Sequence, residues 1–322
     1  MALATRPLTV GVEVIGIDAT RPIPGDIRSE LYSLFIQHGM LLFRDAGASP
    51  EAHTRIAECF GELERHSIKE SWVEGNPHLI DISYIPPPPG TQSVTQPIYE
   101  VGGRRLAGWL PWHTDQCFMP KLSRGGVLRM IQVPPDGGST GFLDKIALYA
   151  SLPEGLKRRI ENLSVVYRFE PRATLHKFGK PEGLRLIDTS AAMDSILDRL
   201  ERDFPPSVHP MVYAQAETGR KVLNVSPAYA VGIEGMATEE GDLLLESVFA
   251  HCLSSPRAYL QDWRNGDMVA WDNWRILHNA EGTPVDHTRL VQRISIKGDY
   301  GLGRLAGWAR PRRQIQIRRI LI

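Results

Sequence analysis

The chain has 322 residues, of which 42% are hydrophobic and 23% are charged, as expected for a globular protein with a buried core. Its 37 basic and 37 acidic side chains balance, so no overall field favours nucleic acid or a membrane surface as a partner. The three cysteines have no paired spacing, which argues against a disulfide framework or a zinc knuckle. Because we find neither a signal-peptide pattern nor an apolar run of membrane-spanning length, we expect a cytoplasmic protein.

The first sixty residues predict alternating strands and helices. Residues 8–17 alternate and are rich in β-branched side chains, which indicates a strand. Apolar residues recur at helical spacing over 24–38, and Gly39 follows as a stop signal. The short apolar run 40–43 is typical of a buried strand, and a second helix is predicted over 50–60.

Regular patterning fades between residues 75 and 111. A strand is predicted over 78–84, but four consecutive prolines and several glycines predict a loop over about 85–111. A long irregular loop inside a compact domain is usually functional or mobile. This loop directly precedes a possible metal-binding run, so we interpret it as a lid or pocket wall, with disorder without function as the alternative.

The remainder of the chain predicts strands and helices without an internal repeat. The predicted strands cover 128–133, 208–213, 221–225, 268–271 and 290–297, and the predicted helices cover 142–152, 154–163, 187–204 and 239–253. We therefore expect a single, mainly β domain over 1–322, with largely antiparallel strands and flanking helices. Six arginines lie in a basic extension over about 304–322, which we interpret as a solvated or subunit-contacting tail rather than an anion-binding segment.

Two side chains of the run Trp112-His113-Thr114-Asp115 share one face if the chain is extended, because alternate residues of a strand point the same way. His113 and Asp115 would then offer a nitrogen and an oxygen to one metal ion, while Thr114 points away. The tripeptide alone is a weak signal, and a hydrogen-bonded rim histidine is the alternative interpretation. Cys117 continues along the same face, as a core residue or part of a pocket wall.

A second group of polar residues follows late in the chain. The run 267–278 carries a strand into a turn and back towards His278. Arg289 and Arg293 are four residues apart on or beside the next strand, so both face one side. Two guanidiniums on one strand face are costly to bury without anionic partners. Surface salt bridging is the alternative interpretation of this pair.

These motifs occur in the order and at about the spacing found in one known family. The chain resembles the taurine/2,4-dichlorophenoxyacetate (TauD/TfdA) branch of the Fe(II)- and 2-oxoglutarate-dependent dioxygenases, from near residue 8 to about residue 300. The motifs that carry the resemblance are residues 112–115, 137–140 (Gly-Gly-Ser-Thr) and 271–273 (Trp-Asp-Asn), with His278, Arg289 and Arg293, and more weakly 60–63, 209–210 and 217–219.

The resemblance implies an iron site made by His113, Asp115 and His278. Two imidazoles and one carboxylate on a single face leave three iron positions open. In this family 2-oxoglutarate fills two of them and dioxygen takes the third. The far carboxylate of the cosubstrate needs a planar bidentate donor. By its spacing from His278, Arg289 resembles the arginine that fills this role in the family, and the resemblance implies that Thr140 adds a hydroxyl. The alternative for Thr140 is that it only closes its turn.

The resemblance also suggests residues that contact the primary substrate. Arg293 matches a position that some relatives use to grip an anionic group, and His66 aligns with a substrate-contacting histidine. Lys69 and Trp109 stand where the taurine enzyme has a tyrosine and an asparagine, and Tyr229 offers an aromatic wall. These departures argue against taurine itself and favour a larger or aromatic anionic molecule.

The implied fold is a double-stranded β-helix, the jelly roll of cupin-like and clavaminate synthase-like proteins. The implied reaction couples decarboxylation of 2-oxoglutarate to succinate and CO2 with oxidation, usually hydroxylation, of an unactivated C–H bond. Relatives also desaturate or cyclise, and the sequence does not choose among these outcomes. One alternative is a zinc hydrolase with the same three ligands, but it would leave Arg289 and Thr140 without a role. The other is a non-catalytic sensor with a vestigial site, which requires one metal ligand to be missing, whereas none is missing in this sequence. We expect a small-molecule substrate and a homo-oligomer, either a dimer or a tetramer.

Overall fold

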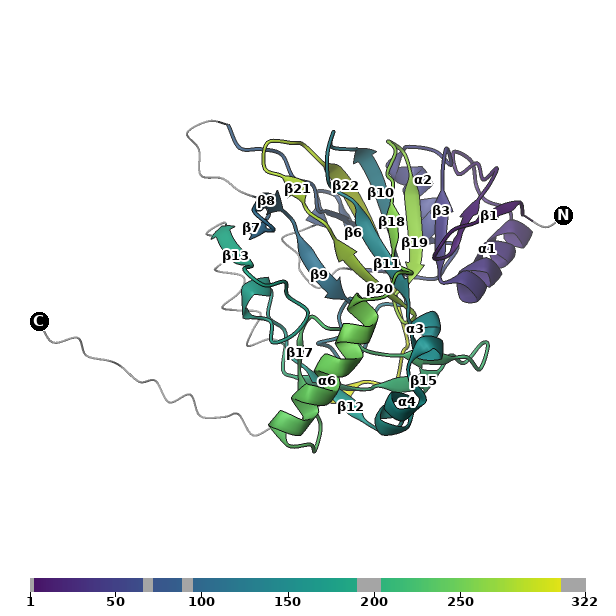
Figure 1. Ribbon diagram of the computed structural model, residues 1–322. Helices are drawn as coiled ribbons and strands as arrows, with labels where there is room; N and C mark the ends of the chain where they lie inside the picture. Colours follow the sequence, from purple (N-terminus) through teal and green to yellow (C-terminus); the bar gives the residue numbers. More distant parts are fainter. Residues whose placement is uncertain (1–2, 66–71, 89–94, 190–203, 308–322) are drawn as a thin grey trace, which may run out of the picture.

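The computed structural model describes residues 3–65, 72–88, 95–189 and 204–307 (Figure 1). Its largest element is a nine-stranded sheet with the order β1-β2-β3-β19-β10-β22-β6-β5, in which β4 also pairs with β22. The strands are β1 (Thr5–Pro7), β2 (Val12–Val14), β3 (Met40–Phe43), β4 (Leu63–Glu64), β5 (Trp72–Val73), β6 (Asn76–Asp81), β10 (Gly125–Gln132), β19 (Met268–Asp272) and β22 (Leu290–Ile296). The strands predicted over 40–43, 128–133, 268–271 and 290–297 are confirmed as β3, β10, β19 and β22.

A second sheet has the order β18-β11-β20-β9 and is entirely antiparallel. Its strands are β9 (Leu110–His113), β11 (Thr140–Asp144), β18 (Tyr259–Gln261) and β20 (Ile276–Ala280). The two sheets share one core, in which Leu128 and Trp271 of the large sheet pack with Phe142 and Ile276 of the small one. Two packed, mainly antiparallel sheets form the predicted jelly roll, with β2 and β3 as a parallel pair in the large one.

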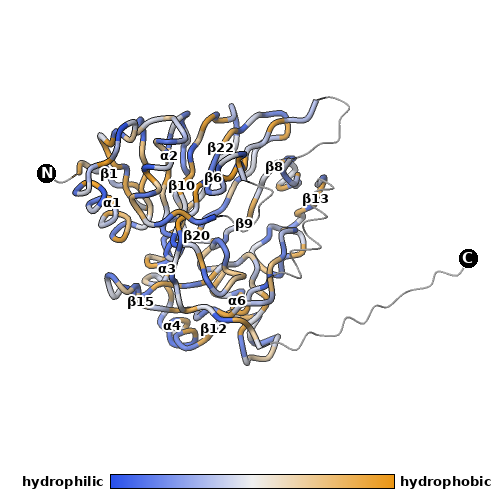
Figure 2. Tube along the Cα trace, turned by 180° about the vertical axis from the view of Figure 1, so that it is seen from behind, coloured by the Kyte–Doolittle hydropathy of each residue, from blue (hydrophilic) through white to orange (hydrophobic). Residues whose placement is uncertain are grey.

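Helices α1 (Gly25–His38) and α2 (Pro50–Ala57) cover the other face of the large sheet (Figure 1). Helix α1 ends at Gly39, whose φ of 77° is left-handed, and its N–H donates to the carbonyl of Phe35. Helix α2 begins where the side chain of Ser49 accepts the N–H of Ala52. Both helices were predicted, and hydrophilic and hydrophobic residues alternate along α1 (Figure 2).

A third group of elements packs below the small sheet around helix α6, as seen in Figure 1. It comprises α3 (Lys145–Ser151), α4 (Glu154–Ile160), α6 (Thr238–Leu253), the sheet of β12 (Ser164–Tyr167), β14 (Ser207–Pro210), β17 (Ala230–Ile233) and β23 (Arg304–Leu305), and the hairpin of β15 (Val212–Ala214) and β16 (Lys221–Leu223). The strand predicted over 221–225 and the helix predicted over 239–253 are confirmed as β16 and α6. No helix among the described residues is long and apolar enough to cross a bilayer.

The predicted loop over 85–111 is more regular than expected. Within it, β7 (Ile98–Val101) and β8 (Arg104–Ala107) form a hairpin that also pairs with β13 (Arg185–Asp188) and β21 (Thr283–Pro284). Gly102 and Gly103 close the hairpin with φ values of 57° and 78°, a left-handed pair that matches the twist of the strands. The prediction of an irregular loop over this whole range was therefore wrong, because residues 98–107 form a hairpin.

Two other predictions need correction. Of the strand predicted over 8–17, only residues 12–14 form a strand, β2, while β1 precedes the predicted range. Gly11 turns the chain between the two strands with a φ of 75°, and a Cβ there would lie 2.2 Å from the carbonyl oxygen of Met40. The start of the helix predicted over 187–204 is wrong, because residues 185–188 form β13. Positions 190–203 of that predicted helix lie outside the described residues. Most of the basic extension, 308–322, also lies outside them. A short 3-10 helix, η2 (Ala173–Leu175), completes the fold.

Candidate metal centre

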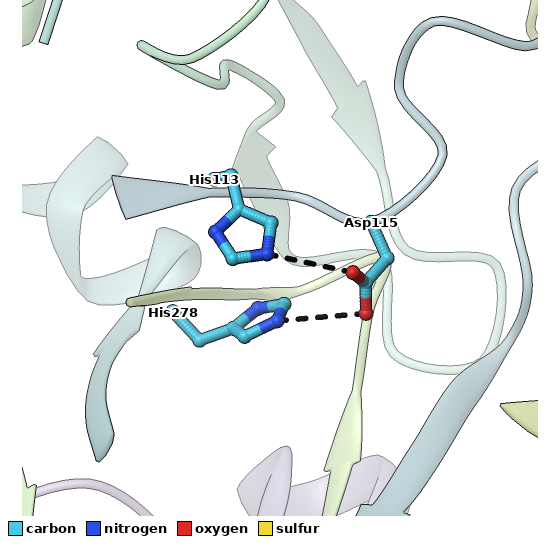
Figure 3. A group of neighbouring side chains, drawn as sticks. All are labelled: His113, Asp115 and His278. Carbon is cyan, nitrogen blue, oxygen red and sulfur yellow. Dashed lines mark ion pairs between the residues drawn. The ribbon is translucent and has the colours of Figure 1, made fainter. Parts of the chain in front are cut away.

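Three side chains that could bind one metal ion converge between the sheets. His113, Asp115 and His278 offer ligand atoms that all lie within 4.8 Å of one another. The Nε2 atoms of His113 and His278 lie 3.5 Å from Oδ1 and Oδ2 of Asp115 respectively, so both rings face the carboxylate (Figure 3). This proximity follows from the pairing of β9 with β20, which places His113 directly opposite His278.

The two imidazoles are held differently. Nδ1 of His113 lies 2.8 Å from the carbonyl oxygen of Pro111, so Nδ1 carries the proton and Nε2 keeps its lone pair for a metal. Nδ1 of His278 has no hydrogen-bond partner in the described structure. Packing fixes this ring instead, with its centroid 5.1 Å from that of Trp271. Both histidines are buried, so water competes little for their nitrogens.

The charges around the cluster suit a divalent cation. Burial opposes ionisation of Asp115, but Arg293 and the two histidines outweigh it and hold the pKa of Asp115 well below its ordinary value. Burial, followed by the nearby His113, holds the pKa of His278 well below its ordinary value, so this imidazole is neutral. An ionised carboxylate with neutral imidazoles is the form in which these groups bind metal. The donor set matches the two-histidine, one-carboxylate sites of non-haem iron oxygenases.

Arg293 lies beside the cluster, as expected of a residue near bound substrate. One of its terminal nitrogens lies 2.6 Å from Oδ2 of Asp115, and its guanidinium sits over the ring of Trp271, 5.1 Å from the centroid. Its Nε is buried without a hydrogen-bond partner among the described atoms. Arg293 therefore retains a donor for a further acceptor at this position.

Arg289 contacts the chain just before β11, the strand that begins at Thr140. Nε of Arg289 donates to the carbonyl of Gly138 at 3.1 Å, and the Thr140 hydroxyl accepts from Nε1 of Trp263 at 3.3 Å. Burial lowers the pKa of Arg289 to about 10, and no ion pair to a carboxylate is present for it in the described part of the chain. Arg289 is partly buried, and withdrawing a guanidinium from water without an anionic partner is unfavourable, so this position suits an anionic ligand.

The remaining predicted substrate residues have different surroundings. Trp109 is buried in a wall with Tyr99, with ring centroids 5.8 Å apart. Tyr229 has a φ of 68° and lies edge-on to Phe118 at 5.2 Å; burial raises its phenol pKa, and the charge of Asp115 adds to the effect. Tyr229 is thus close enough to Asp115 for the charge of this carboxylate to act on its phenol. His66 and Lys69 lie outside the described residues.

Sequence reasoning missed several residues around the cluster. The Asn273 amide accepts the N–H of Asp115 at 2.9 Å and donates to its carbonyl at 3.0 Å. Behind the strand, Nζ of Lys145 donates to the hydroxyl of Thr114 at 3.1 Å. Asn273 does lie in the Trp-Asp-Asn motif, but its contact joins residues 158 positions apart, so no local signal reveals it.

Glu64 is another residue that sequence reasoning missed. It lies opposite Ser295 on β22, so it shares a sheet face with Arg293 two positions away. Burial raises its pKa, and its Oε2 is buried without a hydrogen-bond partner in the described structure. This carboxyl group is therefore a further unsatisfied polar group near the cluster.

Comparison with known proteins gives a consistent answer. A family model described as "Taurine catabolism dioxygenase TauD, TfdA family" matches residues 4–295. An (S)-phenoxypropionate/alpha-ketoglutarate-dioxygenase of Sphingobium herbicidovorans is 30% identical over 270 residues, which are 84% of this chain and 86% of that protein. An alpha-ketoglutarate-dependent 2,4-dichlorophenoxyacetate dioxygenase of Cupriavidus pinatubonensis is 28% identical over 312 residues, 93% of this chain and 99% of that one.

A solved structure shares the fold. The crystal structure of AAD-2 in complex with Mn(II) and N-oxalylglycine matches with a TM-score of 0.69 and 24% identity, covering 92% of this chain and 98% of that chain. At this identity the likeness shows the common fold alone.

Proposed function

This chain belongs to the TauD/TfdA family of dioxygenases, as its motifs predicted, and on that premise we propose that it hydroxylates a C–H bond of a small organic anion. It is a 2-oxoglutarate-dependent dioxygenase that uses Fe(II), 2-oxoglutarate and dioxygen. The observation that carries the proposal is the convergence of His113, Asp115 and His278. The partly buried guanidinium of Arg289, which has no ion pair among the described residues, supports it. Oxidative decarboxylation of 2-oxoglutarate would release succinate and CO2.

In the proposed site His113, Asp115 and His278 hold the iron. The bound ferrous ion supplies the activation of dioxygen that is coupled to decarboxylation of the keto acid. The protein keeps the His278 imidazole neutral and the Asp115 carboxylate ionised, which suits metal binding. Because the cluster is buried between two sheets, bulk water has little access to the reacting centre.

Arg289 would bind the far carboxylate of 2-oxoglutarate. Its burial, its lowered pKa and the lack of an ion pair among the described residues support an anionic ligand there. A guanidinium can donate two parallel hydrogen bonds to a carboxylate, which fixes orientation as well as position. The hydroxyl of Thr140 would add a further bond, since it accepts from Trp263 and still has a proton to donate.

The primary substrate is proposed to be a carboxylate or a similar anion with an aromatic or comparably bulky body. Arg293 offers the cationic contact next to the cluster. Tyr229 lies near Asp115 and packs with Phe118 and Phe169, which provides an aromatic wall for the body. The two relatives named above act on phenoxy acids, which have this combination of groups.

Two other classes of function fit less well. A zinc hydrolase would use the three ligands but would leave the partly buried Arg289 without an anionic partner. A non-catalytic sensor is not supported either, because all three ligands are present and close together. The comparisons favour neither class. A homo-oligomeric state and a cytoplasmic location remain predictions.

Anaerobic titration with Fe(II) and 2-oxoglutarate tests the site. We expect a weak visible charge-transfer band from the chelated keto acid, and its absence would reject the cosubstrate assignment. His113→Ala should abolish the band. The matched control is His251→Ala on α6, where the histidine contacts Ser151, and this variant should retain the band.

A succinate-release screen tests the substrate class. We expect stimulation by aryloxy and other bulky carboxylates, and weaker stimulation by small aliphatic sulfonates. Stimulation by sulfonates alone would contradict the proposed carboxylate class while leaving the dioxygenase assignment intact.

A further inference from the structure

Lys145 is a buried cation directly behind the metal cluster. It is the first residue of α3 and has no exposed surface, and its ammonium donates to Oγ1 of Thr114 at 3.1 Å. An ammonium is seldom buried without a carboxylate partner, because water solvates the charge far better than the protein interior does. No ion pair to Lys145 is present in the described part of the chain.

The groups around Lys145 leave Thr114 as its specific partner. Asp272 and Asp144 are the nearest carboxylates that act on its charge, but they already pair with Arg124 and Arg275 respectively. The other neighbours include the buried thiols of Cys117 and Cys252, which are weak acceptors. Burial lowers the pKa of Lys145 to about 8, consistent with these poorly solvating surroundings.

Thr114 occupies the position between two of the proposed ligands. Its side chain turns away from the cluster, towards α3, while those of His113 and Asp115 turn towards it. Its N–H donates to Oγ of Ser226 at 3.1 Å, so both polar ends of Thr114 are fixed from the same region behind the strand. Movement of Thr114 would change the spacing of its two neighbours.

We propose that Lys145 is a positioning residue of the metal centre, which fixes the separation of His113 and Asp115 through the hydroxyl of Thr114. This role rests on the proposed function, because it assumes that these residues bind the metal. Among the described residues, the hydrogen bond of the Lys145 ammonium is to Thr114 and not to a proposed metal ligand. It acts as an anchor in α3 for the strand end that carries two ligands.

The proposal predicts the sign of the effect on metal binding. A nearby positive charge alone would weaken binding of a cation, so removing Lys145 would then tighten binding. The positioning role predicts the opposite, since a loosened strand end no longer holds its ligands at the right spacing.

The test is a double-mutant cycle in the full chain with Mn(II) as the probe, read as the dissociation constant from the electron paramagnetic resonance signal of free Mn(II). Lys145→Met and Thr114→Val should each weaken binding by about 10-fold, the lower end of the effect of losing a partner of a metal ligand. The double variant should bind no more weakly than the weaker single variant, because both changes break the same contact. Lys157→Met, a lysine of α4 paired with Glu154, is the matched control.

Several outcomes would overturn the inference. Tighter Mn(II) binding by Lys145→Met would show that charge repulsion dominates, and additive losses would show that Lys145 does not act through Thr114. A lower melting temperature of Lys145→Met with unchanged Mn(II) affinity would show that Lys145 stabilises the fold without positioning the metal ligands. If Lys145→Met does not fold, Thr114→Ser should retain wild-type affinity where Thr114→Val loses it, and equal affinities of these two would reject the contact.

A separate outcome concerns the proposed function. Failure of the wild-type chain to bind Mn(II) at all would reject the metal centre itself, independently of Lys145. As a second readout, the charge-transfer band of the Fe(II)–2-oxoglutarate complex should shift in Lys145→Met and not in Lys157→Met.

Discussion

The side-chain amide of Asn273 bridges the main chain of Asp115, accepting its N–H at 2.9 Å and donating to its carbonyl at 3.0 Å. The same Nδ2 donates to the carbonyl of Ser123 at 3.2 Å, and the side chain is fully buried. Asn273 therefore satisfies three buried main-chain groups at once, including both polar groups of a proposed metal ligand. This residue holds the turn that follows β9.

Asn273→Asp should be strongly destabilising, because a carboxylate cannot donate to the two carbonyls. We expect a loss of at least about 2 kcal/mol in the free energy of unfolding and a loss of bound metal. Urea denaturation and metal analysis measure the two effects. The control is Asn265→Asp, an exposed residue that only accepts a bond from Val133. An unchanged unfolding midpoint with full metal content would contradict the role of Asn273.

Arg289→Ala should raise the KM for 2-oxoglutarate by about 10- to 100-fold, the range expected for loss of charge-assisted hydrogen bonds. The kcat at saturating cosubstrate should change less, because Arg289 is far along the cosubstrate from the reacting end in the proposed binding mode. Arg289→Lys, which keeps the charge without the planar fork, should be intermediate. If Arg293→Ala raises this KM and Arg289→Ala leaves it unchanged, the two arginine assignments are reversed.

Gly126→Ala should disturb the cluster without touching a ligand. A Cβ at Gly126 would lie 2.5 Å from the ring of Trp271, which packs against both His278 and Arg293. We expect a loss of about 1–3 kcal/mol from overpacking, together with weaker metal binding. Gly232→Ala is the control, since nothing lies within 4 Å of a Cβ there. Equal stability of the two variants would show that Trp271 can move freely.

Acid should destabilise the metal-free protein from about pH 6.5 downwards. Burial lowers the pKa of His53 in the folded state to about 3, against 6.5 for the unfolded chain, and lowers that of His209 to about 4. Below pH 6.5 the unfolded state binds more protons, so stability is complete above that pH and is lost towards the folded pKa. Each group contributes at most about 1.4 kcal/mol per pH unit.

Urea denaturation between pH 7.5 and pH 4 checks this dependence. His53→Gln, whose amide can still donate to the carbonyl of Val127 in place of Nε2, should flatten the slope. His251→Gln is the control, because this histidine of α6 is only half-buried. A slope that His53→Gln leaves as steep as in the wild type would show that His53 is not the titrating group.

The parts of the fold that the sequence predicted well have local signals. Helices α1 and α2 could be predicted because Gly39 and Ser49 mark their ends. Strands β7 and β8 could not, since four residues show no clear period and their stability comes from pairing with β13 and β21. The glycines at 102 and 103 were the one local sign of that hairpin.

The same distinction applies to the candidate site. The spacing of His113 and Asp115 places both side chains on one face of any extended chain, so this pair could be predicted from the sequence. His278 could be assigned only through resemblance to a family. The roles of Asn273 and Lys145 depend on contacts across 158 and 31 positions, so they emerge only from the folded chain. Residues that hold ligands in place are therefore harder to predict than the ligands themselves.

The pairing of β9 with β20 also has a consequence for how the protein is made. His113 and His278 are register partners, yet about half of the chain lies between them. Contacts of such long range form late, because the intervening segment must be ordered before the two strands meet. A growing chain therefore lacks a complete ligand set until β20 has left the ribosome. In the proposed site, metal uptake would follow nearly complete synthesis and would then stabilise the finished fold by mass action.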